Sequence, residues 1–130
     1  MKKFLKLLPL ALLLAITNVS AKSKVILLDD NSEILGKWTV FAETAALHKI
    51  DNKKLKNKWI FHKDGTLSSF GFDTRLNGFV EVKVNYEIVY GFIIKQVQPS
   101  SPKTETCKVV KLKDDLMTLK CKYLYYLLKR

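Results

Sequence analysis

Residues 59–72 read WIFHKDGTLSSFGF, two short runs of β-type sequence on either side of a turn. In the first run every second side chain is a large aromatic, and the alternate side chains of an extended strand share one face. The turn, Lys63–Gly65, ends in glycine, which accepts the positive φ angle that tight hairpins need. The stretch predicts a β-hairpin, with strands over residues 58–62 and 66–72.

The same two-residue alternation recurs along most of the chain. It predicts further strands over residues 36–43, 79–90, 92–97 and 104–112, and one bent strand or two shorter ones over residues 116–130. In the strand at 36–43, Trp38, Val40 and Ala42 are expected on one face, opposite Thr39, Phe41 and Glu43. The turns are short and leave almost no room for helix, so neighbouring strands are antiparallel. About eight such strands close into a barrel or pack as a sandwich.

The N-terminus has the pattern of a secretory signal peptide over residues 1–21. Lys2, Lys3 and Lys6 precede an apolar core at 7–16, and small residues occupy the cleavage positions before residue 22. This core is too short to span a hydrocarbon layer of about 30 Å. We therefore expect residues 22–130 to form one exported domain, located in the bacterial periplasm or secreted, and not membrane-spanning.

The chain is strongly basic, with a net charge of +11. Removal of the predicted signal peptide leaves 20 basic and 12 acidic residues, a net charge of +8. Such a domain is attracted to anionic envelope surfaces, including phospholipid head groups. The alternative is that the lysines keep the domain soluble and protect strand edges. Nucleic acid is not expected as a partner, because exported proteins rarely meet it and the lysine-rich segment 49–58 lacks interleaved aromatic residues.

Cys107 and Cys121 are the only cysteines. An even pair in an exported domain predicts a disulfide rather than a metal site. A hairpin centred on Asp114 places the two cysteines opposite each other. A two-residue turn at Asp114-Asp115 shifts the register by one and places Cys107 opposite Lys122. The disulfide favours the first register.

Motifs for catalysis, metal binding and cofactor binding are missing from the sequence. His48 and His62 are the only histidines, and neither lies in a zinc-binding pattern. Ser68 and Ser69 lie near His62 across the predicted hairpin, but not in the sequence context of an activated nucleophile. We expect a protein that is not an enzyme and that needs no metal and no cofactor.

Aromatic residues fall almost wholly on the predicted strands. If the barrel is wide enough to hold a cavity, some of them line it and make an apolar pocket with a few hydroxyl groups. The alternative is a barrel whose core is filled. The candidates for a ligand-binding wall are Trp59, Phe61, Tyr86, Tyr123 and Tyr125.

Three segments carry a resemblance to a known family. They are Gly36-Lys37-Trp38, residues 59–67 (WIFHKDGTL) and residues 110–120 (VKLKDDLMTLK). Together they resemble small bacterial lipocalin-like proteins of the calycin type, over most of residues 34–130. The resemblance implies an all-β fold, an antiparallel up-and-down β-barrel of about eight strands, with a small hydrophobic ligand in its cup.

The resemblance also implies a structural pair and a function. Trp38 would pack at the closed end of the barrel beneath a basic residue near the C-terminus, Arg130 or else Lys129, in a cation–π contact. The implied function is non-catalytic binding of a small hydrophobic or amphipathic ligand. The alternative is a small periplasmic barrel that binds a protein partner as an inhibitor or accessory subunit. An acidic partner fits a basic domain best.

Overall fold

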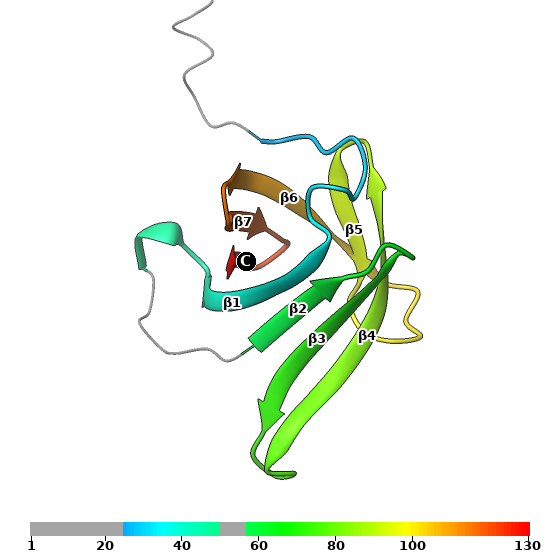
Figure 1. Cartoon of the computed structure of the whole chain (residues 1–130), viewed down its shortest axis with the longest axis vertical. Helices are drawn as coiled ribbons and strands as arrows, with labels where there is room; N and C mark the ends of the chain where they lie inside the picture. The colour runs from blue at the N-terminus through cyan, green and yellow to red at the C-terminus, as the bar shows by residue number, and fades with distance from the viewer. Residues whose placement is uncertain (1–24, 50–56) are drawn as a thin grey trace, which may run out of the picture.

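The computed structural model describes residues 25–49 and 57–130. In it the chain forms a closed antiparallel barrel (Figure 1). Each strand pairs with the next along the sequence, and the last pairs with the first. The strands are β1 (Gly36–Thr44), β2 (Asn57–Phe61), β3 (Thr66–Asp73), β4 (Gly78–Val89), β5 (Phe92–Gln96), β6 (Thr104–Lys113), β7 (Leu116–Lys120) and β8 (Tyr125–Lys129). The predicted up-and-down barrel is confirmed, and the last segment, 116–130, is divided into two strands. The predicted signal peptide lies outside the described residues.

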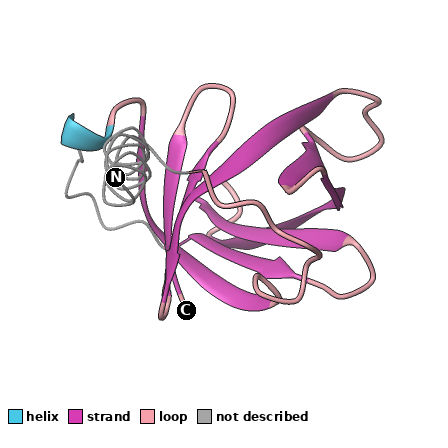
Figure 2. Cartoon of the chain, turned by 90° about the horizontal axis from the view of Figure 1, so that it is seen from above, coloured by secondary structure: helices cyan, strands magenta, loops and turns pink. Residues whose placement is uncertain are grey.

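The turns follow the chemistry expected from the sequence. Gly65 has φ +90°, and the His62 N–H donates to the Thr66 carbonyl at 2.9 Å across the β2–β3 turn. Tyr90 and Gly91 both have positive φ in the two-residue turn between β4 and β5, the geometry that matches the twist of paired strands. Figure 2 shows the strands curving around a common axis, with the short helical turn Leu47–Lys49 at the edge of the barrel.

The hairpin of β6 and β7 contains both registers that the sequence allowed. Val109 lies opposite Leu119, in the register that aligns the cysteines, whereas Lys113 lies opposite Leu116, in the register of a two-residue turn. A bulge between Val109 and Lys111 accommodates the difference. Cys107 and Cys121 form the predicted disulfide, with their Cα atoms 4.1 Å apart.

A second bulge, between Val40 and Ala42 in β1, shifts the pairing of this strand with β8 by one residue. Val40 pairs with the fully buried Leu128, but Ala42 pairs with Leu127 and Glu43 with Tyr126. Paired residues point to the same side of a sheet, so Glu43 lies on the inner side with Tyr126, and Ala42 lies on the same side as Leu127. Trp38, Val40 and Ala42 are all buried while Phe41 and Glu43 are exposed, so the predicted division of the strand holds for burial although the bulge shifts its pairing.

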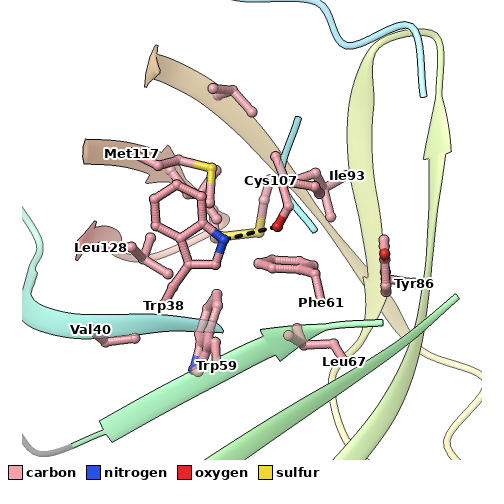
Figure 3. Packing of buried hydrophobic residues seen from close by; sticks show 14 of the residues in the cluster. Trp38, Val40, Trp59, Phe61, Leu67, Tyr86, Ile93, Cys107, Met117 and Leu128 are labelled. Atoms are coloured by element: carbon pink, nitrogen blue, oxygen red, sulfur yellow. Dashed lines mark hydrogen bonds between the residues drawn. A yellow bond between two sulfur atoms is a disulfide. The ribbon is translucent and has the colours of Figure 1, made fainter. Parts of the chain in front are cut away.

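The N-terminal described segment closes one end of the barrel (Figure 1). Ile26 donates its backbone N–H to the Val109 carbonyl at 2.7 Å, and Leu28 donates to the Gly91 carbonyl at 3.1 Å. A Cβ atom at Gly91 would lie 2.9 Å from the Cα of Leu27, so glycine permits both the turn and this close approach. The buried apolar cluster fills the barrel at this end (Figure 3).

Trp38 is the largest fully buried side chain of that cluster. Its indole N–H donates to the Ile34 carbonyl at 2.8 Å (Figure 3). The Arg130 guanidinium lies over the indole, 4.2 Å from the ring centroid, and Arg130 Nη1 donates to the carbonyls of Glu33 and Leu35. Arg130 thus holds the closing segment against the core.

Candidate ligand-binding site

The opposite end of the barrel is open. Here β1, β3, β5 and β7 end, and β2, β4, β6 and β8 begin. A cleft of about 550 Å³ opens at this end, between the inner faces of β1–β4 and β8. Inward-facing side chains of these strands line it, including Glu43, Asn57, Trp59, Ser69, Asp73, Val80, Val82 and Tyr126.

Trp59 and Tyr126 form the aromatic floor of the cleft. Their ring centroids are 4.9 Å apart and their planes are inclined by 45°, a separation at which aromatic rings attract each other. Trp59 is 8% exposed, and its other edge contacts Phe61 of the core. The cleft therefore ends where the filled core begins and does not continue through the barrel to its closed end.

Two carboxylates influence the phenol of Tyr126. Burial raises the pKa of Tyr126 to about 12, and the negative charges of Glu43 and Glu105 contribute to the same rise. The phenol consequently keeps its proton throughout the neutral range. Tyr126 can donate one hydrogen bond to a polar group on a molecule that occupies the cleft.

An ion pair lies inside the barrel beside this floor. Lys95 of β5 faces Glu105 of β6, with Nζ and Oε1 3.0 Å apart and side chains only 13% and 14% exposed. The ammonium also lies 5.7 Å from the centroid of the Trp59 ring, within range of a cation–π attraction. A fixed positive charge and a fixed negative charge therefore stand next to the aromatic floor.

The five predicted wall residues lie in four different places. Trp59 lines the cleft. Phe61 and Tyr86 are buried in the core, with their rings 5.2 Å apart. Tyr123 is 75% exposed in the β7–β8 connection. Tyr125 pairs with Thr44 and Lys120 on the outer side of the sheet.

Tyr126 and the Lys95–Glu105 pair were missed by the sequence analysis. The sequence did contain a signal for the Lys95–Glu105 pair. Glu105 lies two residues before Cys107 on the same strand, so its side chain is on the same face of the sheet. If the cysteine faces inward, Glu105 faces inward too. The position of Tyr126 depends on the register of β8 against β1, which the bulge at Phe41 changes.

The histidine and serine that lie near each other are part of the structure's closed end. His62 Nε2 and Ser68 Oγ are 3.0 Å apart, but Ser68 is fully buried and no substrate reaches its hydroxyl. The Tyr86 hydroxyl donates to the His62 carbonyl at 2.7 Å. This contact ties β2 to β4.

One group in the described part of the chain has the composition of a metal site, Glu105 with Cys107 and Cys121. Both sulfur atoms belong to the disulfide. They are therefore not thiolates, the form of cysteine that binds metal ions. The residues present do not fit a metal.

Two solved structures have a fold similar to that of this chain. The structure superposes on a lipocalin-like protein from Bacteroides uniformis with a TM-score of 0.62 and 16% sequence identity, over 76% of this chain and 99% of the other. The fold is lipocalin-like. An uncharacterised protein from Bacteroides eggerthii gives a TM-score of 0.59 at 16% identity, over 74% of this chain and 98% of the other.

The lipocalin-like fold does not by itself assign a ligand. No protein-family model matches the sequence, and no curated protein matches it significantly. Within the described residues, no helix is long and apolar enough to cross a membrane. The cleft is therefore the feature of the described structure that bears most directly on function.

Proposed function

We propose that this lipocalin-like protein is an exported, non-catalytic binding protein that carries or sequesters a small hydrophobic or amphipathic molecule. The observation that carries the proposal is the cleft at the open end, about 550 Å³ in volume, with Trp59 and Tyr126 as its floor. Binding clefts for small molecules are of this size. The Cys107–Cys121 disulfide supports export to an oxidising compartment such as the periplasm.

The lining favours a ligand with an apolar body and a polar end. Trp59, Val80 and Val82 offer apolar surface, while the Tyr126 hydroxyl, the Asn57 amide and the carboxylates of Glu43 and Asp73 offer polar contacts. The apolar side chains contact the body of the ligand, and the polar groups orient it.

Loss of the Tyr126 ring is expected to weaken binding about tenfold, because one stacking and burial contribution of about 1.4 kcal/mol disappears. The measurement is fluorescence titration with phenylnaphthylamine, a neutral apolar probe, on the parent chain and on Tyr126→Ala. Tyr125→Ala is the matched control, because Tyr125 precedes it on β8 and faces the other side of the sheet.

Thermal unfolding of both variants shows that they remain folded at the titration temperature. Native mass spectrometry of the protein purified from its own envelope then identifies the natural occupant. Equal probe affinity in the two variants, or a stronger loss in Tyr125→Ala, would contradict the proposal.

A second candidate function, docking of an acidic protein partner, is favoured by an apolar groove on the outer face of β1–β4. The groove has a volume of about 320 Å³ and is lined by Lys37, Lys58, Ile60, Phe70 and Phe79. Phe79 is 57% exposed and stacks edge-to-face on Phe72, which is 51% exposed. Exposed apolar surface of this kind marks many interaction sites.

The double substitution Phe72→Ser with Phe79→Ser tests this second function. The parent chain should retain an acidic envelope protein in affinity capture, and the variant should lose it while phenylnaphthylamine binding is unchanged. Retention of the same protein by both chains would exclude this groove as its docking site.

A further inference from the structure

Outward-facing lysines gather on β6, β7 and β8. Cross-strand pairing arranges the outer side chains in three rows, each crossing the three strands: Lys108–Lys120–Tyr125, Lys111–Thr118–Leu127 and Lys113–Leu116–Lys129. We call these residues the lysine face. All of its lysines are exposed, Tyr125 and Leu127 are half-buried, and Thr118 at its centre is buried. None of its positions holds a carboxylate.

The flanking strands add no negative charge to this face. The outer side chains of β5 next to it are Phe92 and Ile94, and those of β1 include Thr39 and Thr44. On the other side of the barrel, by contrast, β4 carries Glu81 and Glu87 on its outer side. On the described strands the outer carboxylates of β4 thus lie away from the lysine face, and the carboxylates nearest to it are those of Asp114 and Asp115 in the β6–β7 turn.

Concentrating the lysines in this way is unfavourable for the isolated protein. Neighbouring strands are about 4.8 Å apart and alternate residues on one strand about 7 Å apart, both shorter than the Debye length of about 8 Å in physiological salt. Lys108 and Lys120 are direct cross-strand partners, an arrangement in which like charges destabilise a sheet. A negatively charged surface held against this face would replace the repulsion with attraction.

The remaining residues of the lysine face suit the surface of a lipid bilayer. Leu116, Leu127 and Tyr125 place apolar and aromatic groups between the ammonium groups. Lys120 Nζ lies 5.6 Å from the centroid of the Tyr125 ring, and Lys108 Nζ lies 5.9 Å from that of Phe92. The outside of a barrel is convex, so the face can touch an extended surface but cannot enclose a small anion.

We propose that the lysine face docks the protein on an anionic phospholipid bilayer. The ammonium groups contact lipid phosphates, and Tyr125 and Leu116 contact the boundary between head groups and acyl chains. The cleft opens at the end of the barrel rather than on this side, so it stays open while the protein is docked.

The test is co-sedimentation of the exported protein with vesicles of phosphatidylcholine alone or mixed with phosphatidylglycerol. Binding is expected only to the mixed vesicles, and it should weaken as salt is added. The triple substitution Lys108→Gln, Lys113→Gln and Lys120→Gln should weaken it on the order of a hundredfold, because each lysine near an anionic membrane contributes about a fivefold gain.

The matched control is Lys58→Gln, Lys63→Gln and Lys83→Gln, which removes the same charge from exposed positions on the other side of the barrel. It should retain most of the vesicle affinity. Equal losses in the two triple variants would show an effect of net charge alone and overturn the proposal. Binding to soluble polyphosphate that is tighter than binding to the mixed vesicles would overturn it too.

Lys120→Glu separates docking from folding. This substitution places a negative charge opposite Lys108, so the melting temperature should rise by about a few degrees while vesicle binding falls. A fall in both the melting temperature and the vesicle binding would show that Lys120 serves the fold and not the membrane contact.

Discussion

Replacement of both cysteines, Cys107→Ala with Cys121→Ala, should lower the free energy of unfolding by about 3 kcal/mol. The disulfide closes a loop that contains the β6–β7 turn, all of β7 and most of β6, with a sequence separation of 14 residues. A loop of this size restricts the unfolded chain by about that amount. Urea denaturation of the parent chain and of the double variant measures the difference, provided that both unfold in a single transition.

A reducing agent supplies the control for this experiment. It should shift the denaturation midpoint of the parent chain toward that of the variant and leave the variant unchanged. Because both sulfur atoms are buried, the parent should react with a thiol reagent only after reduction and unfolding. A midpoint that is the same in the parent and the variant would contradict the stabilising role of the disulfide.

The strands of the barrel were predictable because apolar and polar side chains alternate along a strand wherever one side of its sheet faces a core. Each predicted strand matches an observed one closely, and Gly65 placed the first hairpin correctly. The short turns predicted antiparallel neighbours in a barrel or a sandwich, and the resemblance to lipocalin-like proteins implied the up-and-down barrel that is observed. The sequence alone did not determine whether residues 116–130 bend or break, because Cys121–Leu124 contains no strong turn signal.

The cleft was less predictable, for a physical reason. A strand's alternation tells which residues share a face, but not which of the two faces points inward when both carry aromatic residues. Tyr125 and Tyr126 illustrate this, since adjacent tyrosines look equivalent and only Tyr126 pairs with Glu43 inside the barrel. The bulges at Phe41 and Val110 then shift the pairing partway along their strands, and a bulge leaves no clear mark in a single sequence.

Trp38→Ala should be the most destabilising single substitution, with a loss of about 4 kcal/mol in the free energy of unfolding. Its side chain is fully buried at the closed end, and truncation of a buried tryptophan removes apolar contact and leaves a cavity. The Ile34 carbonyl also loses the indole N–H that it accepts at 2.8 Å. Because Ile34 belongs to the segment that closes the barrel, amide hydrogen exchange around residues 26–35 should accelerate together with the loss of stability.

Arg130→Ala separates the cap from the tryptophan beneath it. The guanidinium lies 4.2 Å from the indole centroid but is exposed to solvent, so its removal should cost only about 1 kcal/mol. Lys129→Ala is the matched control, because Lys129 lies next to Arg130 and points outward, opposite Thr39. Denaturation of the three variants should therefore show the largest loss in free energy of unfolding for Trp38→Ala, a much smaller loss for Arg130→Ala and the smallest loss for Lys129→Ala. An equal effect of the two C-terminal substitutions would mean that the contact between Arg130 and Trp38 does not hold the closing segment in place.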